Sequence, residues 1–442
     1  MLGSEPIIAQ IARLFTSRAG RNGLWAVAEY GAYPLFMLAA TPFFLKWLGV
    51  QQYGRWMFVL VFTGFGGMTG LGMGTAATKE VSAALGRNDK SHALTTVRTC
   101  LTLTIVSSLA FSLLVLVIGL VFGESWFAKI GAWYEVWPLL IFAAILVFLE
   151  QIDQVFAGAL RGAERFDLSA RIEAMAKLVG VVAALGAAFA SGSLWHVLAA
   201  VVAVTLLRMV AKAKVTSDLL SGPTYIPTWS TQGARQIFAF GKWAWLQGIG
   251  SSLFSTVDRL MVGSFLGASS LSHYSICIQL AQQVQTLPAA GAQVLFPAVS
   301  NRITAGKDFA GLIVRGSLLL IMICASLGLA LSILAHPLLS RWINSDFANQ
   351  NTALLQFLTL AYFILGLNIG PHFALFGLGK SNLAASVGIA SGLISIIVMA
   401  VTLGPLGLFG ASLGRLAYGI VALADFYFVW SALKQHGRRV TL

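Results

Sequence analysis

Residues 316–340 of the chain read GSLLLIMICASLGLALSILAHPLLS and contain no Lys, Arg, Asp or Glu. An α-helix crosses the hydrocarbon core of a bilayer with about 20 predominantly apolar residues, so this stretch is long enough to span a membrane. Charge-free runs of similar length recur between Arg55 and Lys79 and between Arg98 and Glu124. The pattern predicts a multi-spanning α-helical membrane protein.

The composition of the whole chain supports this class. Of its 442 residues, 57% are hydrophobic and only 10% are charged, and the mean hydropathy is +0.81. A soluble domain carries about 25% charged residues, so the chain lies far outside that range. The 45 Gly and 11 Pro residues would interrupt soluble helices, but membrane helices accommodate them. We therefore predict an all-α membrane fold.

Turn signals and charged residues divide the chain into twelve predicted transmembrane helices. They cover residues 22–47, 53–85, 93–122, 134–160, 168–190, 193–216, 236–266, 269–302, 309–335, 351–378, 381–403 and 406–433. Between the sixth and seventh lies SDLLSGPTYIPTWSTQGAR, which is rich in Pro, Gly, Ser and Thr and is typical of a linker. We predict an N-terminal six-helix lobe at 1–216, a cytoplasmic linker at 217–235 and a C-terminal six-helix lobe at 236–442.

The distribution of basic residues orients these helices. With both termini in the cytoplasm, the predicted inner side carries 23 Lys and Arg and the outer side carries 4. This asymmetry is the one that the positive-inside rule expects. It also explains most of the net charge of +13, which therefore indicates contact with anionic membrane lipids rather than with nucleic acid.

Two pairs of similar segments stand about half a chain apart. LGVQQYGRW begins at Leu48 and LGASSLSHY at Leu266; ALRGAERFDL begins at Ala159 and ALFGLGKSNL at Ala374. Because six helices separate the copies, both have the same orientation in the membrane. The two lobes are therefore predicted to be parallel, pseudo-symmetric repeats, an organisation common in secondary transporters.

Three segments resemble the signature regions of bacterial polysaccharide flippases, which belong to the multidrug/oligosaccharidyl-lipid/polysaccharide exporter superfamily. They are GMGTAATKEVSAALGRNDK (72–90), ALRGAERFDLSARIE (159–173) and STVDRLMVGSFLGASSLSHYSI (255–276). The resemblance implies two lobes that form a V around a central cavity, lined chiefly by the first, second, seventh and eighth helices. It also implies that the protein moves an undecaprenyl-pyrophosphate-linked oligosaccharide, for O-antigen lipopolysaccharide or exopolysaccharide, across the bacterial cytoplasmic membrane by alternating access.

Asp258 and Arg259 stand side by side in an otherwise apolar run on the predicted seventh helix. Phosphate in a low-dielectric cavity requires cations, so we expect Arg259 to attract the pyrophosphate and Asp258 to tune or release it. The alternative is a structural ion pair with another helix. The other predicted substrate-binding residues are Arg55, Lys79, Arg302, Trp25, Tyr30, Gln247, Gln279 and Gln283. Their Gln residues could equally bond between helices, and Trp near a helix end is often an interface anchor.

Acidic residues within the predicted spans are candidates for coupling transport to H⁺ or Na⁺ entry. By the predicted boundaries these acids are Glu29, Glu150, Asp153, Asp258 and Asp425, and we expect at least one of the first four to couple ion entry to substrate exit. Glu150 and Asp153 are three residues apart and therefore neighbours on one helical face. The alternative is that these carboxylates pair locally with Arg or Lys on the inner loops.

The sequence offers no recognisable enzymatic motif. The glycine run GFGGMTGLGMG (64–74) lacks the GK[ST] ending of a phosphate loop and predicts a bend or close helix packing instead. The three Cys and six His show no metal-ligand spacing, so we predict no metal, no cofactor and no enzymatic activity. The expected partners are a lipid-linked oligosaccharide, membrane lipids, a polysaccharide polymerase and other glycan-assembly proteins, around a monomeric protein.

Two other functions remain open at this point. A multidrug or cation antiporter of the same superfamily would favour an acidic, aromatic cavity, whereas the predicted lining offers Arg259 and several amides. A membrane glycan polymerase or ligase would carry a sizeable extracytoplasmic loop, and every predicted outer connection is short.

Overall fold

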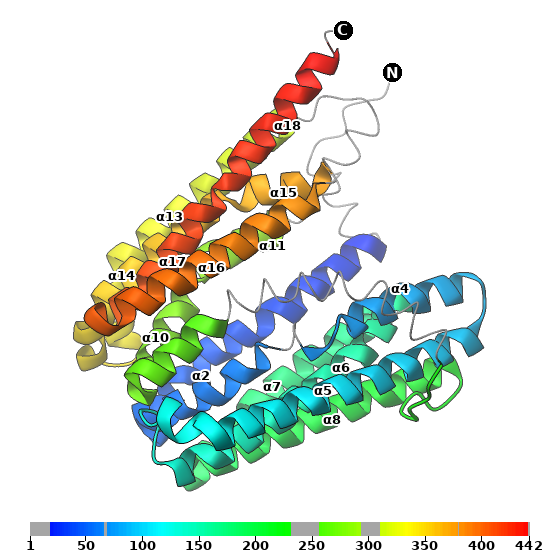
Figure 1. The fold of residues 1–442 in the computed structure, drawn as a ribbon, viewed down its shortest axis with the longest axis horizontal. Coiled ribbons are helices and arrows are strands. Elements are labelled where there is room, and N and C mark those ends of the chain that lie inside the picture. Colours follow the sequence, from blue (N-terminus) through cyan, green and yellow to red (C-terminus); the bar gives the residue numbers. More distant parts are fainter. Residues whose placement is uncertain (1–17, 66–68, 231–255, 293–309, 379, 441–442) are drawn as a thin grey trace. The chain divides into compact units, whose positions relative to one another are not determined.

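A computed structural model describes residues 18–65, 69–230, 256–292, 310–378 and 380–440. Within them the chain is helical and contains no strand (Figure 1). Eight helices or helix pairs are long and apolar enough to cross a membrane: α5 (Lys90–Trp126), α6 (Trp133–Gly162), α7 (Phe166–Ser191), α8 (Leu194–Leu220), α13 (Ala310–Trp342), α14 (Ser345–Leu367) with α15 (Ile369–Gly377), α16 (Ser381–Leu406), and α17 (Leu408–Ala422) with α18 (Ala424–Val440). The predicted all-α, multi-pass membrane fold is confirmed.

The remaining described helices fall within the other four predicted spans. They are α2 (Arg18–Thr63), α4 (Met73–Gly86), residues 256–266, α10 (Ala268–Ala281) and α11 (Gln283–Ala292). Helix α2 covers the first predicted span and the beginning of the second, and it kinks at Gly49, where φ is 79°. The structure therefore describes a helical segment within each of the twelve predicted spans.

The glycine run interrupts the second predicted span, which is not the continuous helix that we expected over 53–85. Helix α2 ends at Thr63 and α4 begins at Met73. Just before α4, Leu71 and Gly72 adopt positive φ angles of 48° and 70°, which a continuing right-handed helix excludes. The bend that the glycines predicted is confirmed.

Close packing of α4 on α6 explains a second part of this run. A Cβ atom at Gly158 would lie 2.1 Å from the carbonyl oxygen of Gly74. The hydroxyl of Thr78 lies 3.0 Å from the carbonyl oxygens of both glycines. Small residues thus let the two backbones approach each other, as is usual in membrane helix pairs.

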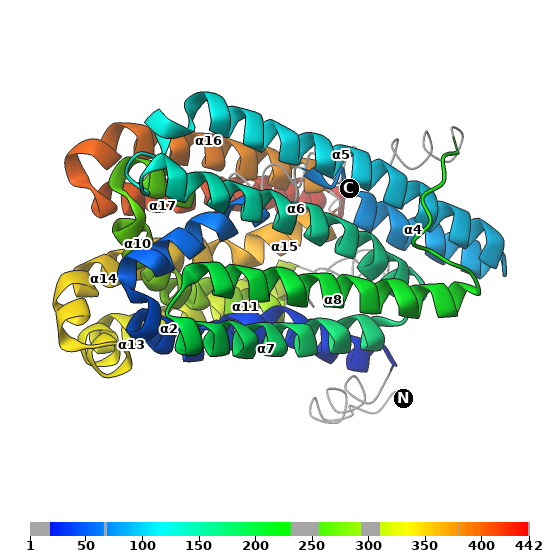
Figure 2. The same ribbon diagram turned by 90° about the horizontal axis from the view of Figure 1, so that it is seen from below.

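The described chain divides into two compact units. The first contains residues up to Leu48, Phe65–Val121 and Pro138 onward to residue 230. Its helices α5, α6, α7 and α8 run alongside one another (Figures 1 and 2). Helix α6 is the central one, because 67% of its most apolar 18-residue stretch is buried, compared with 17% for α5.

The second unit contains Gly49–Gly64, Phe122–Trp137 and the described residues from Thr256 onward. Helix α14 is its most buried long helix, with 56% of the corresponding stretch inside the protein. The segment after the α2 kink packs tightly on α10, since a Cβ atom at Gly54 would clash with the carbonyl of Ala268. The predicted linker and V-shaped arrangement stay predictions.

The predicted repeat is visible in backbone geometry. Helix α7 begins after Arg165 and α16 begins after Lys380, 215 residues later. Both capping residues have similar φ and ψ angles, −95° and 52° against −101° and 38°. Their backbone N–H groups donate to the carbonyls of Leu160 and Leu375, each at 2.9 Å. The two segments that resemble each other in sequence therefore form the same helix–turn–helix.

Candidate substrate and ion-coupling sites

Asp258 takes part in a buried ion pair between helices. Arg415 on α17 places Nε 2.9 Å and Nη2 2.6 Å from Oδ2 of Asp258. The hydroxyl of Tyr274 on α10 donates to the same oxygen at 3.0 Å. Asp258 and Arg415 are each only 4% exposed. This is the arrangement that the alternative interpretation of Asp258 anticipated.

Arg259 is placed differently from its neighbour, since adjacent residues of a helix point about 100° apart. Within the described residues Arg259 forms no ion pair, and its buried Nε has no hydrogen-bond partner. Asp258, the acid beside it in sequence, is held by Arg415. Asp258, Arg259 and Arg415 together therefore carry one net positive charge.

Arg55 is bound to a protein carboxylate. Its Nη1 lies 3.0 Å from Oε1 of Glu135, its Nη2 also pairs with that carboxylate, and its Nε donates to the carbonyl of Ile130 at 3.1 Å. The side chain is buried. This geometry positions the turn before α6. By contrast, Lys79 on α4 is largely exposed, and its Nζ lies 3.2 Å from the carboxylate of Glu80.

The two described glutamines of the predicted site interact locally. Gln283 Nε2 donates to the main-chain oxygen of Gln279 at 3.1 Å, and its Oε1 accepts from the hydroxyl of Thr286 at 3.2 Å. Oε1 of Gln279 is buried and has no partner among the described residues. The other predicted site residues lie outside the described part, either entirely or in their side chains: Trp25, Glu29, Tyr30, Gln247 and Arg302.

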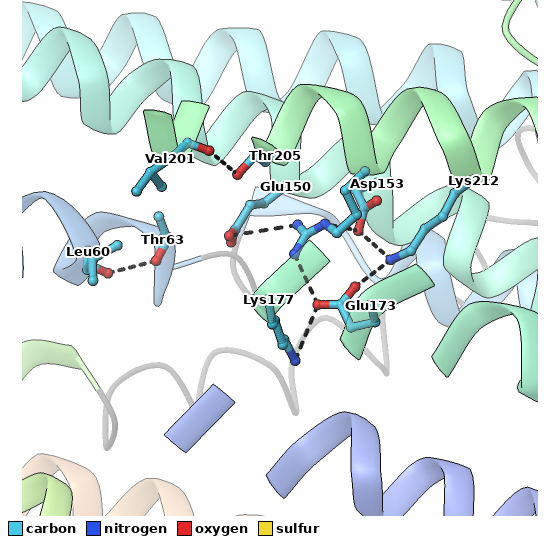
Figure 3. A network of polar contacts seen from close by, with 10 residues as sticks. Leu60, Thr63, Glu150, Asp153, Glu173, Lys177, Val201, Thr205 and Lys212 are labelled. Carbon is cyan, nitrogen blue, oxygen red and sulfur yellow. Dashed lines mark hydrogen bonds and ion pairs between the residues drawn. The ribbon is translucent and has the colours of Figure 1, made fainter. Parts of the chain in front are cut away.

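The acids Glu150 and Asp153 belong to a buried charge network of the first unit (Figure 3). Nζ of Lys212 on α8 lies 2.8 Å from Asp153 Oδ2 and 2.6 Å from Oε2 of Glu173 on α7. Asp153 and Lys212 are almost completely buried. Basic partners for the two acids were expected, but they come from a membrane helix rather than from a loop.

Arg208 joins the three carboxylates of this network. Its Nη1 lies 3.0 Å from Glu173 Oε1, and its Nε lies 3.3 Å from Asp153 Oδ2. Its Nη2 is 3.9 Å from Oε1 of Glu150, which is therefore the most loosely paired acid. Lys177 adds a contact of 3.3 Å to Glu173. Three acids and three bases balance, and they hold α6, α7 and α8 together.

Comparison with known families decides what kind of protein carries these sites. A family model described as "Polysaccharide biosynthesis protein" matches residues 46–351, more than half of the chain. The chain belongs to this family. The resemblance to polysaccharide flippases is thereby confirmed.

Two curated relatives match most of the chain. It is 23% identical over 375 residues to a putative O-antigen transporter of Shigella flexneri, with 83% of this chain and 87% of the relative covered. It is 24% identical over 386 residues to the uncharacterized membrane protein EpsK of Bacillus subtilis, with 84% and 75% covered.

The chain shares its fold with solved multidrug transporters. An inward-facing multidrug resistance MATE family transporter of the MOP superfamily matches with a TM-score of 0.64 at 15% identity, covering 92% of this chain and 95% of that one. A mutant of the Vibrio cholerae MATE transporter VcmN matches with a TM-score of 0.63 at 14% identity, covering 97% and 98%.

Sequence reasoning missed two residues that organise these sites. Arg415 and Glu173 lie in the predicted spans 406–433 and 168–190, but neither is among the predicted site residues. A signal for the second was present, because Glu173 and Lys177 are four residues apart, as are Arg208 and Lys212. Such spacing places charges on one helical face, where they can meet a partner helix.

Proposed function

We propose that this protein is a flippase for an undecaprenyl-pyrophosphate-linked oligosaccharide. It would act in the bacterial cytoplasmic membrane, with both termini in the cytoplasm, and move its substrate from the inner to the outer leaflet. The observation that carries this proposal is Arg259, a cation on a membrane helix without a protein anion among the described residues. The putative O-antigen transporter among its relatives supports the same substrate class.

The electrostatic reason is the cost of phosphate in a low-dielectric environment. A diphosphate that leaves bulk water must find cations, and a guanidinium offers two parallel N–H donors to phosphate oxygens. Arg415 and Tyr274 hold the carboxylate of Asp258, so that this acid does not neutralise Arg259. The cluster keeps a net positive charge, which suits an anionic lipid and disfavours a cationic drug.

Ion coupling fits Glu150 better than Asp153. Asp153 lies 2.8 Å from Lys212 and is fully buried, so protonating it would leave a buried ammonium with a weakened pair. Glu150 is partly exposed, with 34% of its side chain accessible, and the Arg208 guanidinium that pairs with it is 3.9 Å away. We therefore propose Glu150 as the group that takes up and releases a proton during the transport cycle.

Deletion of the gene in its native bacterium tests the proposed function. The deletion strain should lose its surface glycan, accumulate the lipid-linked oligosaccharide and keep its sensitivity to cationic drugs. Complementation with the wild-type chain should restore the glycan. Normal surface glycan together with increased drug sensitivity would instead identify an antiporter.

A further inference from the structure

The second unit contains a pocket that the sites described above do not use, and its largely apolar wall includes several polar side chains. Its volume is about 320 Å³, and α11, α14, α15, α16, α17 and α18 contribute to its wall. Among its lining residues are Gln285, Asn368, His372, Phe373, Tyr418 and Asp425. A carboxylate, two amides, an imidazole and aromatic rings thus surround one small space in a membrane protein.

Asp425 is the acidic group of this pocket, and it is 1% exposed. Its Oδ2 accepts a hydrogen bond from Nδ2 of Asn368 at 2.9 Å and lies 3.3 Å from Nδ1 of His372. Its Oδ1 is buried without a partner among the described residues, and so is Oδ1 of Asn368. A buried acceptor without a donor is costly, so these two oxygens would be stabilised by a ligand that supplies hydrogen-bond donors.

The first unit provides an internal comparison. Asp153 stands 215 residues before Asn368, at the offset of the repeat, and is also buried. There Oδ2 of the acid contacts Lys212 and Arg208 in a balanced network, although its Oδ1 is also buried without a hydrogen-bond partner among the described residues. Within the described residues of the second unit, neither Lys nor Arg pairs with Asp425, and Arg415 is bound to Asp258 instead. The polar groups around Asp425 therefore do not form a structural ion network of that kind.

We infer that this pocket holds one sugar residue of the transported oligosaccharide, an inference that rests on the proposed flippase function. Sugar hydroxyls donate to the free oxygens of Asp425 and Asn368, and such bonds to a carboxylate are stronger than neutral ones. Small-molecule sites have volumes from about 300 Å³ upward, so the pocket has the size for one small polar molecule. A metal cation binds several oxygen ligands, each within about 2.6 Å of the ion, and would therefore fill only a fraction of this pocket.

Gly388 on α16 makes a steric test available. It lines the pocket, and a Cβ atom there would lie 3.9 Å from Oη of Tyr418, an ordinary contact. Gly388→Ala should therefore be tolerated and serve as the matched control. Gly388→Leu fills the space without removing any polar group, whereas Asp425→Asn removes the charge and keeps the shape.

Surface glycan per molecule of protein is measured for the three variants in the deletion strain. Gly388→Leu and Asp425→Asn should each reduce it by about tenfold or more, as expected for loss of hydrogen bonds to a charged group, while Gly388→Ala stays near wild type. Saturation-transfer NMR on the purified full-length protein uses the monosaccharides released by hydrolysis of the host's surface glycan. Wild type and Gly388→Ala should show transfer to at least one sugar, and the other two variants should not.

The outcomes separate this inference from the proposed function. An active Gly388→Leu variant beside an inactive Asp425→Asn variant would mean that the carboxylate binds a proton or cation, and the sugar subsite would be rejected. Wild-type activity in both variants would reject the subsite and leave the flippase function standing. If the wild-type chain itself does not restore glycan, the proposed function and the subsite both fall.

Discussion

Arg415 Nη2 lies 2.6 Å from Asp258 Oδ2. Because Arg415 binds this carboxylate, Arg259, the next residue, has no anionic partner among the described residues. The ion pair joins two helices that are 157 residues apart in sequence. Its consequence is electrostatic as well as structural. The acid that could neutralise Arg259 is held elsewhere, so the positive charge stays available to a ligand.

Removing one member of the Asp258–Arg415 pair should destabilise the protein strongly. Arg415→Leu leaves a buried carboxylate without its cation, which typically costs about 3–5 kcal/mol. The double variant Asp258→Leu/Arg415→Leu removes both charges and should recover much of this loss. Thermal unfolding in detergent compares Arg415→Leu, Asp258→Leu and the double variant, and purely additive losses in the double variant would rule out direct coupling.

Gly158→Ala should weaken the packing of α4 on α6. The added methyl group would lie 2.1 Å from the carbonyl oxygen of Gly74, and overpacking of this kind typically costs about 1–3 kcal/mol. Gly186 on α7 offers the matched control, since a Cβ atom there meets nothing within 4 Å. Gly186→Ala should keep the wild-type melting temperature or raise it. Equal effects of the two substitutions would contradict the close α4–α6 contact.

Glu150→Gln should separate ion coupling from stability. Because Arg208 pairs with Glu150 only at 3.9 Å, neutralising Glu150 should change the unfolding free energy by less than about 1 kcal/mol. Transport of lipid-linked oligosaccharide in proteoliposomes should lose its dependence on an imposed pH gradient. An unchanged dependence on that gradient would remove Glu150 from the coupling mechanism. Lys177→Gln in the same network is the control and should retain the dependence.

Much of the fold followed from the spacing of charges, because a bilayer permits so few backbone arrangements. The twelve spans and the repeat could be predicted in this way, and Arg165 and Lys380 show the repeat in detail. Helix ends were less predictable, as α13 runs to Trp342 and α14 begins at Ser345. Here Asn344 accepts a hydrogen bond from the N–H of Phe347 at 2.8 Å, a local cap that shortens the loop.

The partners of the candidate site residues could be predicted only in part. The sequence shows acids within the predicted spans, where burying a carboxylate costs free energy, and it predicts basic partners for Glu150 and Asp153. The partner of Asp258 was not predicted, since Arg415 is reached only through packing of distant helices. The pocket around Asp425 was missed as well, because Asn368 and His372 are inconspicuous in sequence until the fold brings them to that acid.

The central claim, that Arg259 binds the diphosphate of the substrate, is tested most directly by surface glycan at matched protein levels in the deletion strain. Loss of a hydrogen-bonded charge predicts a decrease of about tenfold to hundredfold for Arg259→Ala. Arg259→Lys keeps the charge but loses the two parallel donors, so it should be intermediate. Arg341→Ala, which removes an exposed cation at the end of α13, should remain near wild type. Wild-type glycan levels in both Arg259 variants would contradict the account.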